Sequence, residues 1–339
     1  MFLHNDHGRD FVLHALYSLW MQLCLRVRKT SPTHRTQISM PLHLLLPLLF
    51  NQGLSIAQLA PSSEIAFVSD TQAPLWIENV FLKANQNQHA TQLIFEDVAS
   101  TKPRALFILG DVVSLGYHDK KWKNVDLYIE ACRKNGIEVH GLMGNHDVMG
   151  RPRRGELNFQ KRFPDHVRTG YVSIIDSVGV VLLNSNFSKL SATAISLQQT
   201  WYQVALKSLD QDAGVKFVIV TCHHAPYSNS KLVGSSKLVQ DHFVPGFMQS
   251  RKGLLFITGH SHAFEHFKKS GKDFLVIGGG GGLHQPLGVR LEDTATNYKP
   301  MFHYLTVTRT ANHLAIMSHL LKSDFSGFEK SYHFTVSLP

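Results

Sequence analysis

Ile137-Glu-Val-His-Gly-Leu-Met-Gly-Asn-His-Asp147 joins a mainly apolar run to a compact polar cluster. The run Ile137–Met143 predicts a β-strand, and Gly144-Asn145-His146-Asp147 follows directly at its carboxyl end. An amide, an imidazole and a carboxylate placed together at the end of a strand have little structural purpose. The cluster therefore predicts a functional loop.

Four further polar clusters follow apolar runs in the same way. They are Asp70-Thr71-Gln72 after Ile65–Ser69, Gly110-Asp111 after Ala105–Leu109, Cys222-His223-His224 after Lys216–Thr221, and Gly259-His260-Ser261-His262 after Leu254–Thr258. The first two clusters taken alone are typical of turns, whereas the last can aim two imidazoles at one centre from alternate residues. Five such strand ends on one rim predict a pocket lined by carboxylates, amides and imidazoles.

The donor atoms in these clusters are oxygen and imidazole nitrogen, and none of the clusters supplies a pair of thiolates. Hard oxygen ligands mixed with imidazole suit Mn, Fe, Zn or Co ions. The clusters offer enough donors for two divalent metal ions in one pocket. The sequence therefore predicts a dinuclear metallohydrolase.

Strand-like runs alternate with helical stretches through the first part of the body, which is typical of parallel βα units. Helices are predicted over 74–98, 120–135 and 195–209, and hairpins over 171–183 and 302–320. This combination predicts an α/β fold, a four-layer α-β-β-α sandwich of two mixed sheets with the metal site at the strand ends. Residues 58–339 contain no repeat and no linker, so we expect a single domain.

The composition of the 339 residues is that of an ordinary globular protein, with 43% hydrophobic and 17% charged residues. The net charge of +9 is diffuse, and no basic run interleaves with aromatic residues, so no nucleic-acid partner is expected. The mild positive bias would attract phosphorylated substrates, although a generic solvated surface is the better explanation of it. Three cysteines do not make a disulfide framework, and we expect free thiols at Cys132 and Cys222.

The first 57 residues differ from the rest of the chain. The apolar run Pro41–Phe50 after Met40 is typical of a secretory signal, and Ser55-Ile56-Ala57 permits cleavage before Gln58. The run is shorter than the roughly 20 residues of a membrane span, so no stable span is expected. We expect export of the mature chain to the periplasm or the outside of the cell.

A signal normally begins close to the initiator, and here residues 1–39 precede it. We therefore expect translation to start at Met40, with residues 1–39 as an upstream stretch. The alternative is that residues 11–24 form an amphipathic helix of their own. If the segment 40–57 is not a signal, a cytoplasmic location is expected.

In their order along the chain, the clusters resemble the signature of calcineurin-like metallophosphoesterases. That signature reads Asp-x-His (or Gln), Gly-Asp, Gly-Asn-His-Asp (or Glu), a later His and Gly-His-x-His, and the resemblance covers residues 64–265. It implies two sets of metal ligands that share one carboxylate: Asp70, Gln72 and His262; Asn145, His223 and His260; and Asp111 in both. It also implies that His146 is the catalytic acid-base residue and that Asp147 orients it.

The implied chemistry is phosphoester hydrolysis. Two cations that share a hydroxide can lower its pKa enough for attack on phosphorus near neutral pH, and His146 would protonate the leaving oxygen. The resemblance thus implies a phosphatase or phosphodiesterase for a phosphorylated small molecule or another phosphoester. Two alternatives stay open, a lipid pyrophosphate hydrolase at a membrane surface and a non-catalytic metal-binding scaffold. The sequence leaves the substrate, the metal pair and the oligomeric state open.

Three positions need comment against the family pattern. Gln72 stands where a histidine is common, and its neutral amide is a weaker ligand than imidazole. Ser114 stands where the purple acid phosphatase branch has a tyrosine that ligates ferric iron, so we expect a non-purple enzyme. Either His223 or His224 can be the later histidine; we prefer His223, nearer the strand end, and place His224 near the substrate.

Five consecutive glycines, Gly278–Gly282, follow the predicted strand 274–277. Glycine lets the backbone approach a ligand closely, and its N–H groups can hold an anion. A flexible loop between strands explains the run equally well.

Overall fold

A computed structural model describes residues 64–76, 78–80 and 82–338. The chain divides into two units, residues 1–58 and 59–339, and the described residues belong to the second. The predicted upstream stretch, signal and cleavage point therefore lie outside the described residues. Among the helices of the described part, none is long and apolar enough to cross a membrane.

Two six-stranded sheets form the centre of the described unit. The first contains, in spatial order, β12 (Phe328–Ser337), β11 (His313–Leu321), β10 (His303–Arg309), β1 (Glu64–Val68), β2 (Ala105–Leu109) and β3 (Glu138–Leu142). The second contains β4 (Tyr171–Ile175), β5 (Val178–Leu182), β6 (Phe217–Thr221), β7 (Gly253–Thr258), β9 (Lys272–Ile277) and β8 (Phe264–Lys269). Parallel strands occupy one part of each sheet and antiparallel hairpins the rest, so both sheets are mixed.

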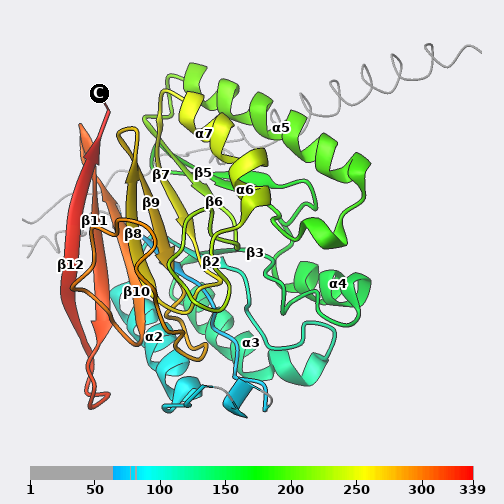
Figure 1. Ribbon diagram of the computed structural model, residues 1–339, viewed down its shortest axis with the longest axis vertical. Helices are drawn as coiled ribbons and strands as arrows, with labels where there is room; N and C mark the ends of the chain where they lie inside the picture. Colours follow the sequence, from blue (N-terminus) through cyan, green and yellow to red (C-terminus); the bar gives the residue numbers. More distant parts are fainter. Residues whose placement is uncertain (1–63, 77, 81, 339) are drawn as a thin grey trace, which may run out of the picture. The chain divides into compact units, whose positions relative to one another are not determined.

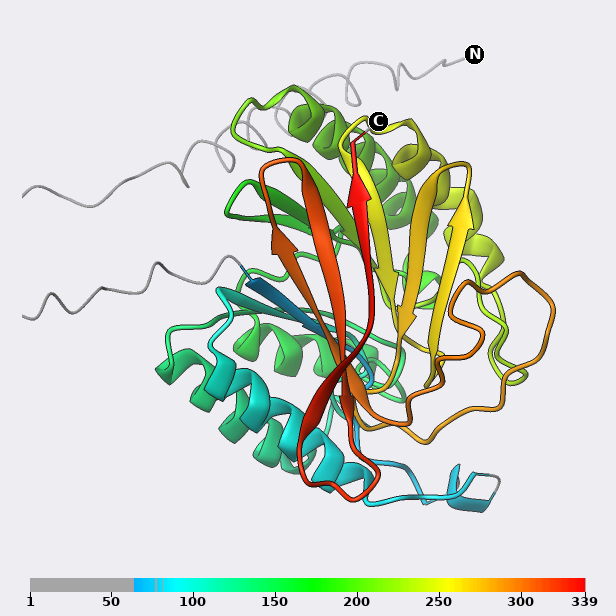
Figure 2. The ribbon, with the colours of Figure 1, turned by 90° about the vertical axis from the view of Figure 1, so that its left-hand side faces the viewer.

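Helices cover the outer face of each sheet, as Figures 1 and 2 show. The first sheet packs against α2 (Asn87–Thr101), α3 (Asp119–Lys134) and α4 (Pro152–Arg162). The second packs against α5 (Ala192–Gln211), α6 (Lys237–His242) and α7 (Val244–Gln249). Two short 3₁₀ helices, η1 (Glu78–Val80) and η2 (Phe187–Lys189), lie in loops. The predicted four-layer α-β-β-α sandwich is confirmed.

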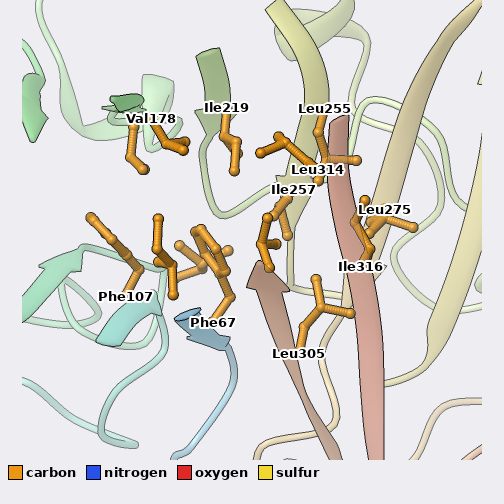
Figure 3. Packing of buried hydrophobic residues seen from close by; sticks show 14 of the residues in the cluster. Phe67, Phe107, Val178, Ile219, Leu255, Ile257, Leu275, Leu305, Leu314 and Ile316 are labelled. Carbon is orange, nitrogen blue, oxygen red and sulfur yellow. The ribbon is translucent and has the colours of Figure 1, made fainter. Parts of the chain in front are cut away.

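The core between the sheets is continuous and apolar. Phe67 and Phe107 from the first sheet face Val178 and Ile219 from the second in Figure 3, and the two phenyl rings stack at 5.2 Å. Burying one such side chain contributes about 1.5–3 kcal/mol to folding. Because β2 is buried along its whole length, the core fixes the strand after which Asp111 stands.

The helix predicted over 74–98 is wrong in its first half, because α2 begins at Asn87. The loop after β1 is hydrogen-bonded to the loop after β2. Thr71 Oγ1 donates to the Val112 carbonyl at 3.0 Å, and Gln72 N–H donates to the Asp111 carbonyl at 3.0 Å. A chain held in this way cannot enter a helix directly. Pro74, Leu75 and Trp76 therefore belong to a loop that precedes η1.

The glycine run forms a tight strap beneath the site. Its N–H groups at Gly278, Gly280 and Gly282 donate to the carbonyls of Ala263, Ser69 and Asp70 at 2.8–3.1 Å. A Cβ at Gly282 would lie 2.5 Å from the His262 ring, so glycine is needed there for close approach. These three N–H groups are engaged with backbone carbonyls, so they are not available to an anion, and they hold the run in place.

Candidate metal centre

Three of the predicted ligands stand at sharp turns where strands end. Asp70 follows β1, Asp111 follows β2 and His260 follows β7, with φ angles of 61°, 49° and 68°. A residue with a side chain rarely adopts this left-handed backbone, which costs about 1–3 kcal/mol unless the surroundings enforce it. Such strained residues cluster at functional sites, and here all three lie at one edge of the sandwich.

Backbone N–H groups fix the two carboxylates. Asp111 Oδ1 accepts the His146 N–H at 2.7 Å, and Asp70 Oδ2 accepts the His260 N–H at 2.9 Å. A Cβ at Gly144 would lie 2.1 Å from Asp111 Oδ1. The loop after β3 can therefore approach the loop after β2 only because residue 144 is glycine.

Asp111, Asn145, His223 and His260 form what we call the nitrogen-rich group. The Nε2 atom of His223 lies 3.2 Å from Asp111 Oδ2 and 3.2 Å from Asn145 Oδ1. Ligand atoms of Asp111, His223 and His260 all lie within 4.8 Å of one another. The other ring nitrogen, Nδ1 of His223, donates to the Leu109 carbonyl at 3.0 Å, so Nε2 points at the group.

Asp70, Gln72, Asp111 and His262 form the oxygen-rich group. His262 Nδ1 donates to the Leu283 carbonyl at 2.7 Å, which turns Nε2 toward Asp70 Oδ1 at 3.5 Å. When the Gln72 amide is oriented to satisfy its neighbours, its nitrogen donates to the carbonyls of Asp70 and Asp111 at 3.2 and 2.9 Å and its oxygen faces His262 Nε2 at 3.3 Å. Ligand atoms of both carboxylates and His262 lie within 4.8 Å of one another.

The donor chemistry of both groups fits a cation. Oxygen and nitrogen atoms face one another at 3.2–3.5 Å, which is unfavourable unless a proton or a metal cation lies between them. Ligating histidines generally donate their other N–H to a carbonyl, as His223 and His262 do here. The residues present therefore match two divalent metal ions that share Asp111.

The pKa values of His223 and Asp111 reflect the charges of the nitrogen-rich group. Burial lowers the pKa of His223, but the Asp111 carboxylate outweighs burial and raises that pKa to about 9. Burial raises the pKa of Asp111, but the imidazoles of His223 and His146 outweigh it and hold that pKa below its usual range. A cluster that keeps a proton on His223 in this way also attracts a metal cation.

His223 and His224 have different surroundings. His223 belongs to the nitrogen-rich group, whereas the His224 ring packs against the His260 ring, with 4.4 Å between the ring centroids, and its Nδ1 lies 2.8 Å from the Ser185 hydroxyl oxygen. Burial and the neighbouring His223 lower the pKa of His224 to about 3. His224 is therefore a neutral imidazole.

The Asp147 carboxylate bonds to backbone N–H groups and not to the His146 ring, which it was expected to orient. Its carboxylate accepts backbone N–H groups of Gly144 at 2.8 Å, Val112 at 3.1 Å and Val113 at 3.2 Å, so it ties two loops together. Burial and the Asp111 charge raise the pKa of Asp147 to about 7 despite these donors. The His146 ring is oriented instead by the Ser114 carbonyl, 3.2 Å from Nδ1.

Several groups that shape the site carried no signal in the sequence. The carbonyls of Leu109, Leu283 and Ser114 are backbone atoms, which any residue type supplies. Ser185 lies between predicted elements, and Glu78 fell inside the helix predicted over 74–98. Its carboxylate Oε1 lies 3.9 Å from His146 Nε2. Only the tertiary fold identifies them.

Comparison with known proteins gives a family match and a set of similar folds. The calcineurin-like phosphoesterase family matches residues 63–264, which is more than half of the chain. That stretch contains every predicted ligand and His146. No curated protein matches the chain.

Three solved structures illustrate the similarity in fold. A purple acid phosphatase from yellow lupin seeds has a TM-score of 0.63 at 15% identity over 81% of this chain, which spans about half (53%) of the lupin chain. GAP50, the anchor in the inner membrane complex of Plasmodium, has a TM-score of 0.60 at 15% identity, over 81% of this chain and 89% of the GAP50 chain. A zebrafish dimetal phosphatase has a TM-score of 0.50 at 12% identity, over 83% of this chain and 100% of the zebrafish chain. At these identities the likeness shows the fold alone.

Proposed function

The chain belongs to the calcineurin-like phosphoesterase family, and we propose that it hydrolyses phosphoesters with two divalent metal ions, one in each ligand group. The observation that carries this proposal is the pair of facing acceptor sets that share Asp111. Mn, Fe, Zn or Co suits such a mixture of oxygen and imidazole donors. The substrate class we propose is a phosphorylated small molecule, cleaved by phosphatase or phosphodiesterase action.

Each polar side chain at the centre then has a task. When bound, the two divalent ions supply a hydroxide nucleophile near neutral pH and neutralise phosphoryl oxygens. His146 Nδ1–H donates to the Ser114 carbonyl, so the acid form is the imidazolium, which delivers its second proton from Nε2 to the leaving oxygen. In the tautomer in which His224 Nδ1 accepts from the Ser185 hydroxyl, its Nε2–H is available to a phosphoryl oxygen.

The proposed metal pair excludes a ferric ion bound to tyrosinate. Ser114 stands three residues after Asp111, where its hydroxyl offers no phenolate and its carbonyl orients His146. The iron-loaded protein is therefore expected to be colourless in the visible range. A tyrosinate charge-transfer band would contradict this part of the proposal.

Metal depletion tests the proposed function. The purified protein is stripped with a chelator, and hydrolysis of an activated aryl phosphate is measured before and after addition of Mn, Fe, Zn or Co. We expect activity to vanish on stripping and to return with at least one of these ions. Undiminished turnover after exhaustive metal removal contradicts the proposal.

A further inference from the structure

A carboxylate outside both ligand groups reaches the catalytic histidine. Glu78 lies in η1, and its Oε1 stands 3.9 Å from His146 Nε2, the same distance as Asp111 Oδ2. His146 Nε2 therefore lies within 4 Å of both a ligand carboxylate and Glu78. The Glu78 side chain is 23% exposed, so a bound molecule can reach it.

The charge of Glu78 is not neutralised by a basic side chain. Among the described residues, no Lys or Arg forms a salt bridge with it, and the one ionisable partner within 4 Å is His146. An anionic group beside a site for phosphoesters repels the substrate unless something positive lies between them. The protein thus keeps an unfavourable charge at the mouth of its own site.

The position of Glu78 indicates which part of the substrate it meets. His146 Nε2 gives its proton to the leaving oxygen in the proposed reaction, and Glu78 Oε1 lies 3.9 Å from that nitrogen. Atoms of the leaving group beyond that oxygen therefore pass within reach of the Glu78 carboxylate.

An exposed aromatic residue belongs to the same turn. The Glu78 N–H donates to the Leu75 carbonyl at 3.0 Å and closes a turn that contains Trp76, whose side chain is 78% exposed. A large aromatic side chain this exposed is unusual in a globular protein. Aromatic faces combined with a carboxylate attract quaternary ammonium groups.

We infer that Glu78, assisted by Trp76, selects phosphoesters whose leaving group carries a cation, of the quaternary ammonium class represented by choline. This inference rests on the proposed function, because the proposed proton transfer from His146 is what places the leaving group near Glu78. Glu78 is then a specificity-determining residue. Its charge favours a cationic leaving group over a neutral one of the same shape.

Two non-hydrolysable ligands that differ in one charge test the inference. They are 3-(trimethylammonio)propylphosphonate, with a cationic tail, and its carbon isostere 4,4-dimethylpentylphosphonate, with an uncharged tail. Each is titrated calorimetrically into the Mn-loaded protein. We expect the cationic ligand to bind about tenfold more tightly. Glu78→Gln should bring the ratio of affinities close to one, and Glu78→Lys should invert it. Trp76→Leu should reduce the ratio by a few-fold.

The control is Glu96→Gln, which removes an exposed carboxylate bonded to Gln92 on α2 and should leave the ratio unchanged. The ligand with the uncharged tail is an internal reference, because a misfolded variant loses affinity for both ligands alike. A ratio of one in the wild type, or an unchanged ratio in Glu78→Gln, overturns the inference. Hydrolysis of aryl phosphate is measured separately, so failure of the proposed function is distinguished from failure of the selectivity.

Discussion

The oxygen-rich and nitrogen-rich groups share Asp111 and differ in the rest of their donors. The first adds one carboxylate, one amide and one imidazole (Asp70, Gln72 and His262), whereas the second adds one amide and two imidazoles (Asn145, His223 and His260). Their supports differ too. The glycine strap packs under Asp70 and His262, and Asp147 ties the loops that carry Asp111 and Asn145.

This difference predicts unequal metal preferences within one centre. Two carboxylates and an amide oxygen favour a harder ion such as Mn, while two imidazoles favour Zn and the other late divalent ions. The shared carboxylate makes the groups interdependent, because its charge stabilises both ions at once. Experiments can therefore ask which residues act on both groups and which act on one.

The largest expected effect is that of Asp111→Ala. Because this carboxylate belongs to both groups, metal content should fall from about two ions per chain to near none, and turnover should fall to background. Asp111→Asn should do the same, although its side-chain oxygen can still accept the His146 N–H that Asp111 Oδ1 accepts now. Elemental analysis beside aryl phosphate kinetics measures both quantities.

Asp126→Ala is the matched control. Asp126 pairs with Arg162 on the outer helices, with one oxygen 2.7 Å from Arg162 Nη2, and belongs to neither ligand group. It should keep both ions. Retention of one ion per chain in Asp111→Ala would show that the two groups bind independently.

The second effect separates metal binding from proton transfer. His146→Ala should keep metal content near the wild-type level and lose about 10²–10⁴-fold in rate, most for substrates with poor leaving groups. Comparing aryl phosphates of graded leaving-group pKa, with metal analysis on the same samples, measures both. Equal metal loss in His146→Ala and Asp111→Ala refutes the assigned roles.

The third effect is a pH dependence of metal binding in the nitrogen-rich group. The pKa of His223 is about 9 in the metal-free protein, so near neutral pH a metal ion must displace its proton. The apparent affinity for Zn should therefore rise about tenfold per pH unit between pH 6 and 8, and level off above the pKa. Competition with a chromophoric chelator measures the affinity.

His223→Asn is the variant that tests this slope. It keeps an oxygen donor but removes the proton that the metal displaces, so the dependence should weaken by about one decade per pH unit. The affinity of the variant should be lower throughout. An unchanged slope would mean that another group, and not His223, releases the proton.

The fold was predictable wherever local pattern and tertiary position agreed. β1, β2 and β6 are short apolar runs that are buried on both faces, and the polar residue after each one marks its end. β8 was missed, because its Phe-Glu-His-Phe-Lys-Lys pattern turns Glu265 inward, where it accepts from the Ser228 hydroxyl at 2.7 Å. No local pattern reveals that partner.

The same contrast between local sequence pattern and tertiary position holds at the site. The seven proposed ligands were predictable because metal chemistry dictates residue types in short clusters after strands. The orienting role expected of Asp147 was wrong, because sequence adjacency to His146 says nothing of where its carboxylate points. Glu78 was not predictable, because its contact with His146 spans 68 positions and depends on a loop that resembles a helix.

The smallest effect concerns the amide of the oxygen-rich group. Gln72→His should lower the metal concentration that gives half-maximal activity by about three- to tenfold, because imidazole is a better donor to late divalent ions. Turnover need not rise with it, since a more electron-rich metal acidifies its bound water less. The variant should also lose about 1 kcal/mol of unfolding free energy, because imidazole cannot donate to the carbonyls of both Asp70 and Asp111.

Gln198→His is the control for that stability loss. Gln198 is a fully buried amide that exchanges two backbone hydrogen bonds with Asn184 at 2.9 Å and belongs to neither ligand group. The same substitution there should cost stability and leave the metal titration unchanged. An altered titration in Gln72→His alone therefore reports ligation and not loosened packing. An unaltered one, in a folded variant, removes Gln72 from the oxygen-rich group and leaves that ion to its two carboxylates and one imidazole.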